Sequence, residues 1–402
     1  MKNWKKRFAV LGTAQAVSML TSSILQMSVI WHLTLRTESA IVITMATLCS
    51  FMPRALLGLF SGAFIDRFDR KKVLIVSDGS MAFAALLLAA SFFFAETPIA
   101  FIYFILCVRS VGAAFHAPCL NSIIPSIVPK DQLTRCAGIA QGFDSISLII
   151  SPALAAVLYN FWDLGFIILL DVLGAAVAIA AVLFLPIPRE RASAVCDGEF
   201  NILRDTKEGI EVLRKEPGMI SILVICMVYS FIYFPIGSMY PLITIVYFGG
   251  TIADSSFVEI VFSSGTLVGA VLLAAANNRI NKVKAIACSI AVYGIGAAFT
   301  GLLPTSGLVP FIAASAVMGI TIPFFHGSRT AIFQSKIADA YLGRALSLAH
   351  SVTLFAAPLG LLFGGSFSMV VGVNYCFLAC GIAAILLAIA VLVLPATRKL
   401  DL

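Results

Sequence analysis

Long apolar runs alternate with short charged segments along the whole chain of 402 residues. A helix needs roughly 20 apolar residues to cross about 30 Å of hydrocarbon at about 1.5 Å per residue. The runs cover residues 8–31, 40–65, 73–95, 98–117, 136–159, 164–185, 219–248, 257–276, 285–303, 308–326, 345–368 and 371–394. The pattern therefore predicts an all-α membrane protein with twelve transmembrane helices.

Composition excludes a soluble domain and gives no sign of a cofactor. Hydrophobic residues make up 60% of the chain and charged residues 12%, far from the usual proportions of soluble domains. The nine cysteines form no C-x-x-C pair, and the sequence has no G-x-x-x-x-G-K-[ST], no H-E-x-x-H and no nucleophile elbow. We therefore expect no metal, no cofactor and no enzymatic activity, so that an ion gradient must supply the energy.

The basic residues predict the orientation of the helices, because cytoplasmic loops hold Lys and Arg in excess. With the N-terminus inside, the cytoplasmic segments carry 24 of the 27 Lys and Arg residues, which leaves Arg36 outside and Arg54 and Arg109 within spans. The net charge of +7 is thus spread over short loops, which argues against nucleic-acid binding. Both termini are predicted to be cytoplasmic.

A repeat divides the chain into two halves. His116 recurs as His326, 210 residues on, and Arg135 recurs as Arg344, 209 residues on. This period matches the spacing of the spans and predicts two six-helix bundles related by a parallel pseudo-two-fold axis along the membrane normal. The predicted halves are residues 1–185 and 219–402, joined by a cytoplasmic linker at 186–218 that contains a surface helix. Such halves enclose a cavity that opens to either side by alternating access.

The loop after the second run, GAFIDRFDRKK at residues 62–72, closely resembles the cytoplasmic signature of the major facilitator superfamily, G-x-L-a-D-R-x-G-R-K. Asp69 stands where the second glycine of that signature is expected. The resemblance implies the major facilitator fold and a cytoplasmic gate, in which basic side chains pair with acids when that side closes. The gate residues are Gly62, Asp66, Arg67, Arg70 and Lys71, with Asp78 as an expected partner of the basic loop.

Further segments narrow the resemblance. Residues 14–18, 109–159 and 162–164 are similar to the macrolide-efflux proteins of bacteria. This implies a multi-pass protein of a bacterial plasma membrane that exports hydrophobic or amphipathic antibiotics in exchange for protons, and we expect it to be monomeric. Export of a siderophore or another metabolite, import, and a non-transporting membrane sensor remain the alternatives.

Ionisable residues inside the predicted spans are candidates for proton coupling, because a charge at the bilayer centre costs at least about 2.5–3.5 kcal/mol. Arg109 and Asp144 both lie near mid-depth and form the predicted proton-linked pair; a purely structural ion pair is the alternative. Asp171 and Glu259 are further candidates, but they lie nearer the outer ends of their spans and are expected to be hydrated. Arg54 is expected to meet an anionic substrate or to pair with an acid.

Polar side chains repeat at helical spacing on several predicted spans. The candidates for the substrate cavity are Gln15, Ser18, Ser22 and Gln26 in the first span, Gln141 in the fifth, and Tyr229, Tyr233 and Tyr240 in the seventh. Tyrosines also pack between helices, so both interpretations stay open for the seventh span. Pro235 and Pro241 predict that its outer half is kinked or unwound. His116 and His326 end their predicted spans and are expected to have interfacial structural roles.

Overall fold

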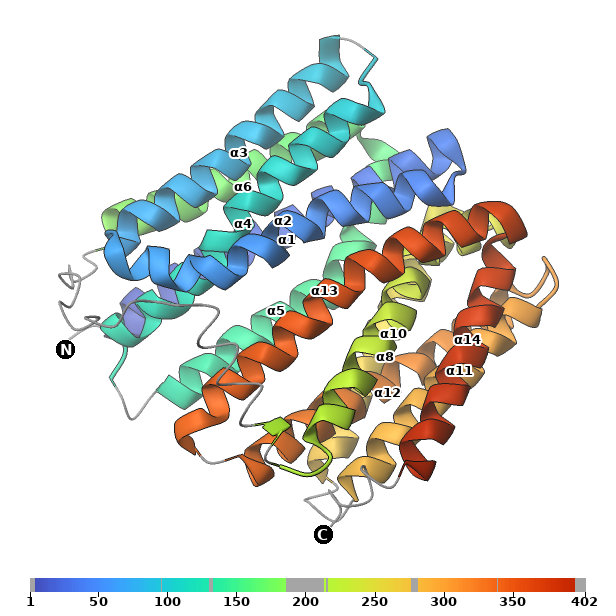
Figure 1. Cartoon of the computed structure of the whole chain (residues 1–402). Helices are drawn as coiled ribbons and strands as arrows, with labels where there is room; N and C mark the ends of the chain where they lie inside the picture. Colours follow the sequence, from blue (N-terminus) through green and yellow to red (C-terminus); the bar gives the residue numbers. More distant parts are fainter. Residues whose placement is uncertain are drawn as a thin grey trace. The chain divides into compact units, whose positions relative to one another are not determined.

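The computed structural model describes residues 4–94, 96–129, 133–185, 213–214, 216–275, 281–337 and 339–394. The chain divides into two compact units, Met1–Leu33 with Met45–Phe200 and Thr34–Thr44 with Asn201–Leu402. The described residues of both units are helical, and the predicted all-α fold is confirmed (Figure 1). Most of the predicted linker at 186–218 lies outside the described residues.

Twelve helices of 20 residues or more are present in the described part of the chain. The first six are α1 (Trp4–Thr37), α2 (Ala40–Arg67), α3 (Arg70–Phe94), α4 (Ile99–Ile127), α5 (Leu133–Phe161) and α6 (Leu164–Phe184). The others are α8 (Met219–Ser238), α10 (Ile252–Ala275), α11 (Lys282–Leu302), α12 (Leu308–Lys336), α13 (Asp339–Val371) and α14 (Val373–Val393). Ten contain a described stretch long and apolar enough to cross a membrane, and α5 and α13 contain shorter ones at Ile149–Phe161 and Phe355–Val371.

Helix α4 differs clearly from its predicted span. That span ended at residue 117, but α4 continues to Ile127 and includes Pro118 and Pro125. Proline removes a hydrogen bond from a helix interior, so the sequence suggested an end where this helix continues. His116 consequently lies eleven residues before the end of α4, which corrects the expected position at the end of a span.

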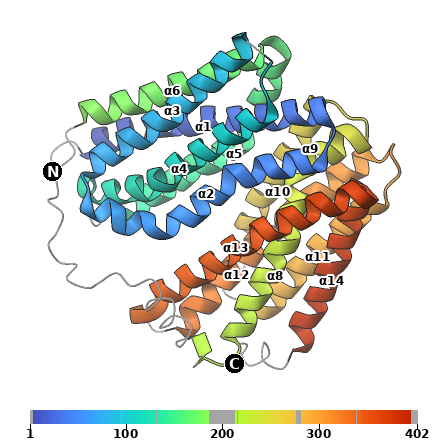
Figure 2. The same ribbon diagram turned by 45° about the horizontal axis from the view of Figure 1, so that its top comes forward.

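In the first unit α3 packs against both α4 and α6 (Figure 2). An apolar cluster holds one end of the unit together, and its members include Leu11 of α1, Leu74 of α3, Ile123 of α4 and Val182 of α6. Helix α6 also approaches α1 closely, because a side chain at Gly174 would collide with Thr21. These contacts fix the depth of the polar residues of α1, α3, α4 and α6 relative to one another.

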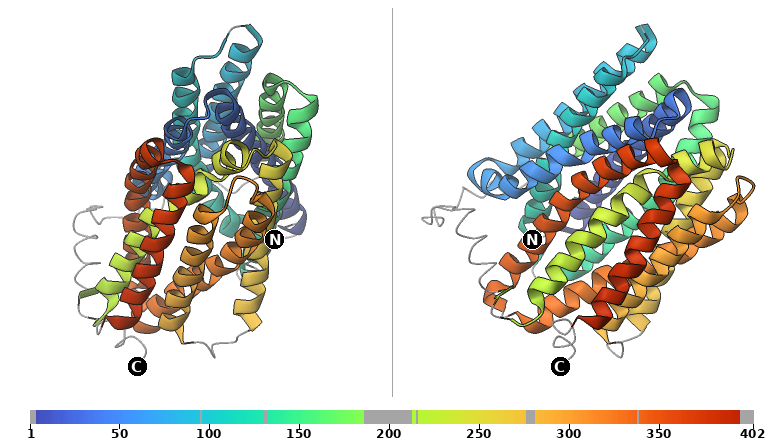
Figure 3. Two further views of the ribbon diagram at one scale, coloured as in Figure 1. Left: turned by 90° about the vertical axis from the view of Figure 1, so that its right-hand side faces the viewer. Right: turned by 45° about the vertical axis from the view of Figure 1, so that its right-hand side comes forward.

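In the second unit α10 packs against α12, α11 packs against both α12 and α14, and α8 packs against α13. Figure 3 shows these helices, coloured yellow-green to red, from two further sides. Glycines make the contact between α10 and α12 close: a Cβ atom at Gly265, Gly269 or Gly319 would collide with the backbone of the facing helix. Small residues let membrane helices approach until their backbones touch, which gains van der Waals contact where lipid offers no hydrophobic driving force.

The seventh predicted span is interrupted, as its prolines predicted. Helix α8 ends at Ser238, and the chain continues as the short α9 (Tyr240–Leu242) and a π-helical turn, η2 (Ile243–Tyr247). The Tyr247 hydroxyl donates to the carbonyl oxygen of Leu303 at 2.8 Å, which anchors this irregular segment to the end of α11.

Candidate functional site

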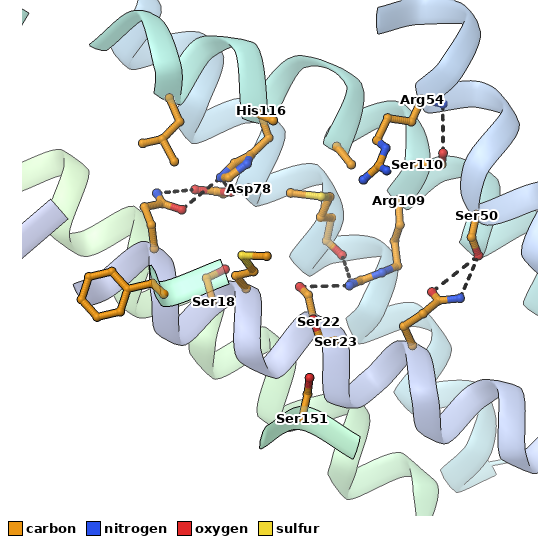
Figure 4. Close-up of a pocket in the computed structure, with 18 of the residues that line it drawn as sticks. Ser18, Ser22, Ser23, Ser50, Arg54, Asp78, Arg109, Ser110, His116 and Ser151 are labelled. Atoms are coloured by element: carbon orange, nitrogen blue, oxygen red, sulfur yellow. Dashed lines mark hydrogen bonds and ion pairs between the residues drawn. The ribbon is translucent and has the colours of Figure 1, made fainter. Parts of the chain in front are cut away.

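A cavity of about 590 Å³ lies in the first unit (Figure 4). Its wall comes from α1 to α5 and mixes polar side chains with methionine and phenylalanine. Gln15, Ser18, Ser22 and Gln26, the stripe noted in the first span, all line it. Sequence reasoning missed further lining residues, among them Ser23, Ser50, Ser110, Met19, Met27 and Met81, because a single serine or methionine in an apolar run carries no signal of its own.

A buried ion pair stands at one part of the wall. Nη1 of Arg109 lies 2.5 Å from Oδ2 of Asp171, and the two side chains are 10% and 2% exposed. Ser22 closes the group: its hydroxyl donates to Oδ1 of Asp171 at 2.6 Å and accepts from Nη2 of Arg109 at 3.3 Å. Nη1 of Arg109 also donates to the carbonyl oxygen of Met81 at 3.1 Å. Three neighbouring helices, α1, α3 and α6, therefore hold the guanidinium of α4 in place beside the cavity.

The acid that pairs with Arg109 among the described residues is thus Asp171. The sequence had predicted Asp144 as this partner. Asp171 was expected to be hydrated, but its side chain is only 2% exposed. Residues of α1 and α4 cover it, although it lies only seven residues from the start of α6. The side chains of Asp144 and Gln141 lie outside the part of the chain that the structure describes, and their roles stay predictions.

A second polar cluster joins Asp78, His116 and Gln15. Oδ1 of Asp78 lies 3.2 Å from Nε2 of His116, and Gln15 hydrogen-bonds with both residues. Asp78 was expected to serve the basic loop and His116 to have an interfacial structural role. The structure gives Asp78 a different partner and corrects the position of His116, because α4 runs past His116 and carries it to the depth of Asp78 in the cavity wall (Figure 4). The roles of both residues stay predictions.

Arg54 and Gln26 occupy another part of the wall. Gln26 donates to Ser50 at 3.1 Å. The Arg54 guanidinium lies 6.0 Å from the ring centre of Phe51, a favourable cation–π distance. No carboxylate lies within ion-pair distance of Arg54 among the described residues. The side chains of Asp66 and Asp144 lie outside these residues, so both expectations for Arg54, contact with an anionic substrate and pairing with an acid, stay open.

The basic loop has contacts within its own unit. Nζ of Lys71 donates to the carbonyl oxygens of Leu183 and Leu185 at 2.8 and 3.0 Å, at the C-terminal end of α6, where a cation is favourable. Arg70 donates to the carbonyl oxygen of Ser122 at 3.1 Å. Asp69 accepts from the backbone N–H of Lys71 at 3.0 Å and so caps the start of α3. The side chains of Asp66 and Arg67, and the surroundings of Gly62, lie outside the described part.

Lys71→Met is expected to lower the free energy of unfolding by about 1 kcal/mol, because the terminal carbonyls of α6 lose a charged donor. Thermal unfolding of the purified protein in detergent measures this change. Lys72→Met, at the exposed neighbouring position, is the control and should have no effect. If Lys71→Met alters transport and leaves stability unchanged, a gating role outweighs the capping role.

The tyrosines of the seventh span lie in the second unit and pack against other aromatic rings. The Tyr229 ring centre lies 4.3 Å from that of Phe325 and 5.9 Å from that of Tyr233. Tyr240 packs against Phe311 at 5.6 Å. Tyr229 and Tyr240 are buried, which favours packing between helices for these two. Tyr233 and Glu259 are partly exposed and stay candidates for a cavity.

Helices long and apolar enough to cross a membrane, together with a cavity lined by a buried ion pair, are typical of a membrane transporter. The chain belongs to the Major Facilitator Superfamily, whose family model matches residues 11–246 and 222–401. It is 42% identical over 402 residues to macrolide efflux protein A of Streptococcus pyogenes, with 100% of this chain and 98% of that protein covered. A macrolide efflux protein A of Enterococcus faecalis is 42% identical over 325 residues, 80% of this chain and 99% of that protein.

The fold agrees with the solved structures of transporters. A variant of the nucleoside transporter NupG matches with a TM-score of 0.77 at 14% identity, over 97% of this chain and 99% of that one. At this identity the likeness concerns the fold alone.

Proposed function

We propose that the chain exports macrolide-like, amphipathic molecules across a bacterial plasma membrane in exchange for protons. Both termini are cytoplasmic in this proposal, and the protein works as a monomer by alternating access. The observation that carries it is the cavity of the first unit with a buried ion pair in its wall. The similarity to macrolide efflux protein A over the whole chain supports the substrate class.

The cavity lining suits a large molecule with an apolar body and scattered oxygen atoms. Small-molecule sites usually have volumes of about 300–1,000 Å³ with a few convergent polar groups, and this cavity of about 590 Å³ falls within that range. Met19, Met27 and Met81 supply flexible apolar surface that adapts to different shapes. Ser23 and Gln26 add hydrogen-bonding groups, so that shape and a few polar contacts select the substrate.

Coupling is assigned to the group formed by Arg109, Asp171 and Ser22. A proton and the Arg109 guanidinium compete for the Asp171 carboxylate, because protonation removes the charge that holds the arginine. Once released, Arg109 can turn its donors toward a molecule in the cavity, whose wall it already forms. Proton binding at Asp171 thereby changes the cavity that the drug meets.

The test uses susceptibility and flux together. In a host without its own drug pumps, expression is expected to raise resistance to macrolides, and in proteoliposomes drug addition is expected to move protons. Asp171→Asn should abolish the proton movement, whereas Asp144→Asn should leave it unchanged. If expression raises resistance to no amphipathic drug, the proposed substrate class is wrong. If Asp144→Asn loses the proton movement and Asp171→Asn keeps it, the coupling role belongs to Asp144.

Export of an anionic metabolite such as a siderophore is the second candidate. Arg54 favours it, because this cation lines the cavity and has no carboxylate at ion-pair distance among the described residues. A siderophore panel in the same proteoliposomes separates the two. Arg54→Gln should weaken transport of an anionic substrate strongly and that of a macrolide little.

A further inference from the structure

The cluster around Asp78 is separate from the Arg109 centre. Asp78 of α3 is 1% exposed, and its Oδ1 lies 3.2 Å from Nε2 of His116 on α4. Gln15 of α1 joins the two: its Nε2 donates to Oδ2 of Asp78 at 3.4 Å, and its Oε1 lies 3.0 Å from Nε2 of His116. Three helices thus converge on one carboxyl group (Figure 4).

The described groups that face Asp78 include no permanent cation at ion-pair distance. His116 faces it from α4 and the uncharged Gln15 from α1, while Asp171 of α6 acts on it electrostatically. Gln141 and Asp144 of α5 lie outside the described side chains. Asp171 differs in this respect, because it is held by a guanidinium that does not lose its proton. Of these two carboxyl groups, Asp78 is the one whose partner is a histidine.

We propose that Asp78 and His116, bridged by Gln15, form a second proton-binding site of this transporter. The inference rests on the proposed function, proton-coupled export, and adds a second proton-binding site to the pathway that begins at Asp171. A carboxylate buried this deeply is unfavourable without an opposite charge, and histidine gains and loses its proton near neutral pH. The pair holds one proton, on the imidazole or on the carboxyl group, and is then uncharged overall.

Release of the proton leaves a neutral imidazole and a carboxylate, with a net charge of minus one. That state becomes accessible when water reaches Asp78, which happens when the cavity opens on the side of the cluster. The proton leaves to this water, and no other reactant is needed. Binding and release are therefore tied to the side of the membrane that the cavity faces.

The position of the cluster suits release. His116 follows Arg109 by seven residues on α4, which places the two clusters about 10 Å apart along one face of the helix. Asp78 is nearer the start of α3 than Met81, whose carbonyl oxygen receives Arg109. In the proposed orientation this end is cytoplasmic. A proton that reaches Asp171 from outside thus finds its next acceptor about two helical turns further in.

The test compares exchange with coupled transport in proteoliposomes, with radiolabelled erythromycin as the probe. The key variant combines Asp78→Asn with His116→Gln, because it removes both titratable groups and keeps hydrogen-bonding side chains of similar shape. Exchange of erythromycin at equal pH on both sides should survive, while accumulation driven by a pH gradient and the accompanying proton movement should be lost. His116→Gln alone should flatten the pH dependence of exchange.

His326→Gln is the matched control. His326 occupies the equivalent place in the repeat, but it is exposed on α12 in the second unit, so its substitution should leave both exchange and coupling unchanged. Size-exclusion chromatography and thermal unfolding check that each variant is folded. Where the double variant is not folded, the pH profile of His116→Gln decides alone: an unchanged profile overturns the inference.

A purely structural ion pair gives a different result. The uncharged Asn and Gln side chains of the double variant would then keep the helices packed, and this variant would couple like the unaltered protein. That outcome overturns the inference and leaves proton-coupled export intact. If the unaltered protein itself moves no protons with erythromycin, the proposed function fails and the inference falls with it. Loss of coupling with preserved exchange in the double variant supports the site.

Discussion

Arg109→Met is expected to destabilise the protein by about 3–5 kcal/mol, because it leaves the Asp171 carboxylate buried without its counter-charge. Asp171 is 2% exposed, and the Ser22 hydroxyl is then its remaining described donor. One hydroxyl cannot replace a guanidinium at 2.5 Å. Thermal or denaturant unfolding of the purified protein in detergent measures the loss.

The cavity offers a matched control in Arg54→Met. This arginine also lies in a membrane helix and lines the same cavity, but it has no carboxylate at ion-pair distance among the described residues. Its substitution should change stability by less than about 1 kcal/mol. If the two variants are equally stable, the pair with Asp171 does not hold the helices together.

A double variant separates stability from coupling. Arg109→Met with Asp171→Leu removes both charges, and replacing a buried ion pair by apolar residues is often neutral or stabilising. Most of the lost stability should therefore return, whereas proton-coupled transport should not. Recovery of coupling in this variant would exclude the pair from the proton pathway.

The twelve helices could be predicted because the bilayer imposes their length and apolar character. Their ends were less certain, since a helix in a membrane can continue through prolines and polar residues that would end it in water. Helix α4 shows the consequence. The predicted end at residue 117 placed His116 at the membrane surface, whereas the helix continues to Ile127. The cluster with Asp78 was missed for this reason.

The charged centre could be predicted only in part. Arg109 is recognisable in the sequence because a cation within a span is costly, but its partner depends on which helices pack together. Depth along each helix favoured Asp144, whereas contacts of α4 with α1 and α6 supply Ser22 and Asp171. Similarly, the charges of the loops predict the orientation of the helices in the membrane. They do not predict that Lys71 binds the carbonyl oxygens at the end of α6.

Gly319→Leu is expected to destabilise the second unit by about 3 kcal/mol, because α10 and α12 touch backbone to backbone at this point. Even a Cβ atom would collide with the carbonyl oxygen of Phe262, so the helices must separate. Gly265 and Gly269 face α12 in the same way, and separation would loosen their contacts too. Gly319→Ala should show a smaller loss in the same unfolding measurement.

Gly237→Leu tests whether the loss comes from the crossing or from leucine itself. Gly237 lies in α8 of the same unit, and a Cβ atom there would meet nothing within 4 Å. Leucine also favours a helix more than glycine does, by up to about 1 kcal/mol, so this variant should be as stable as the unaltered protein or slightly more stable. Equal losses at Gly237 and Gly319 would mean that the second unit does not depend on the close approach of α10 and α12, and its packing would then have to come from the apolar side chains that surround the crossing.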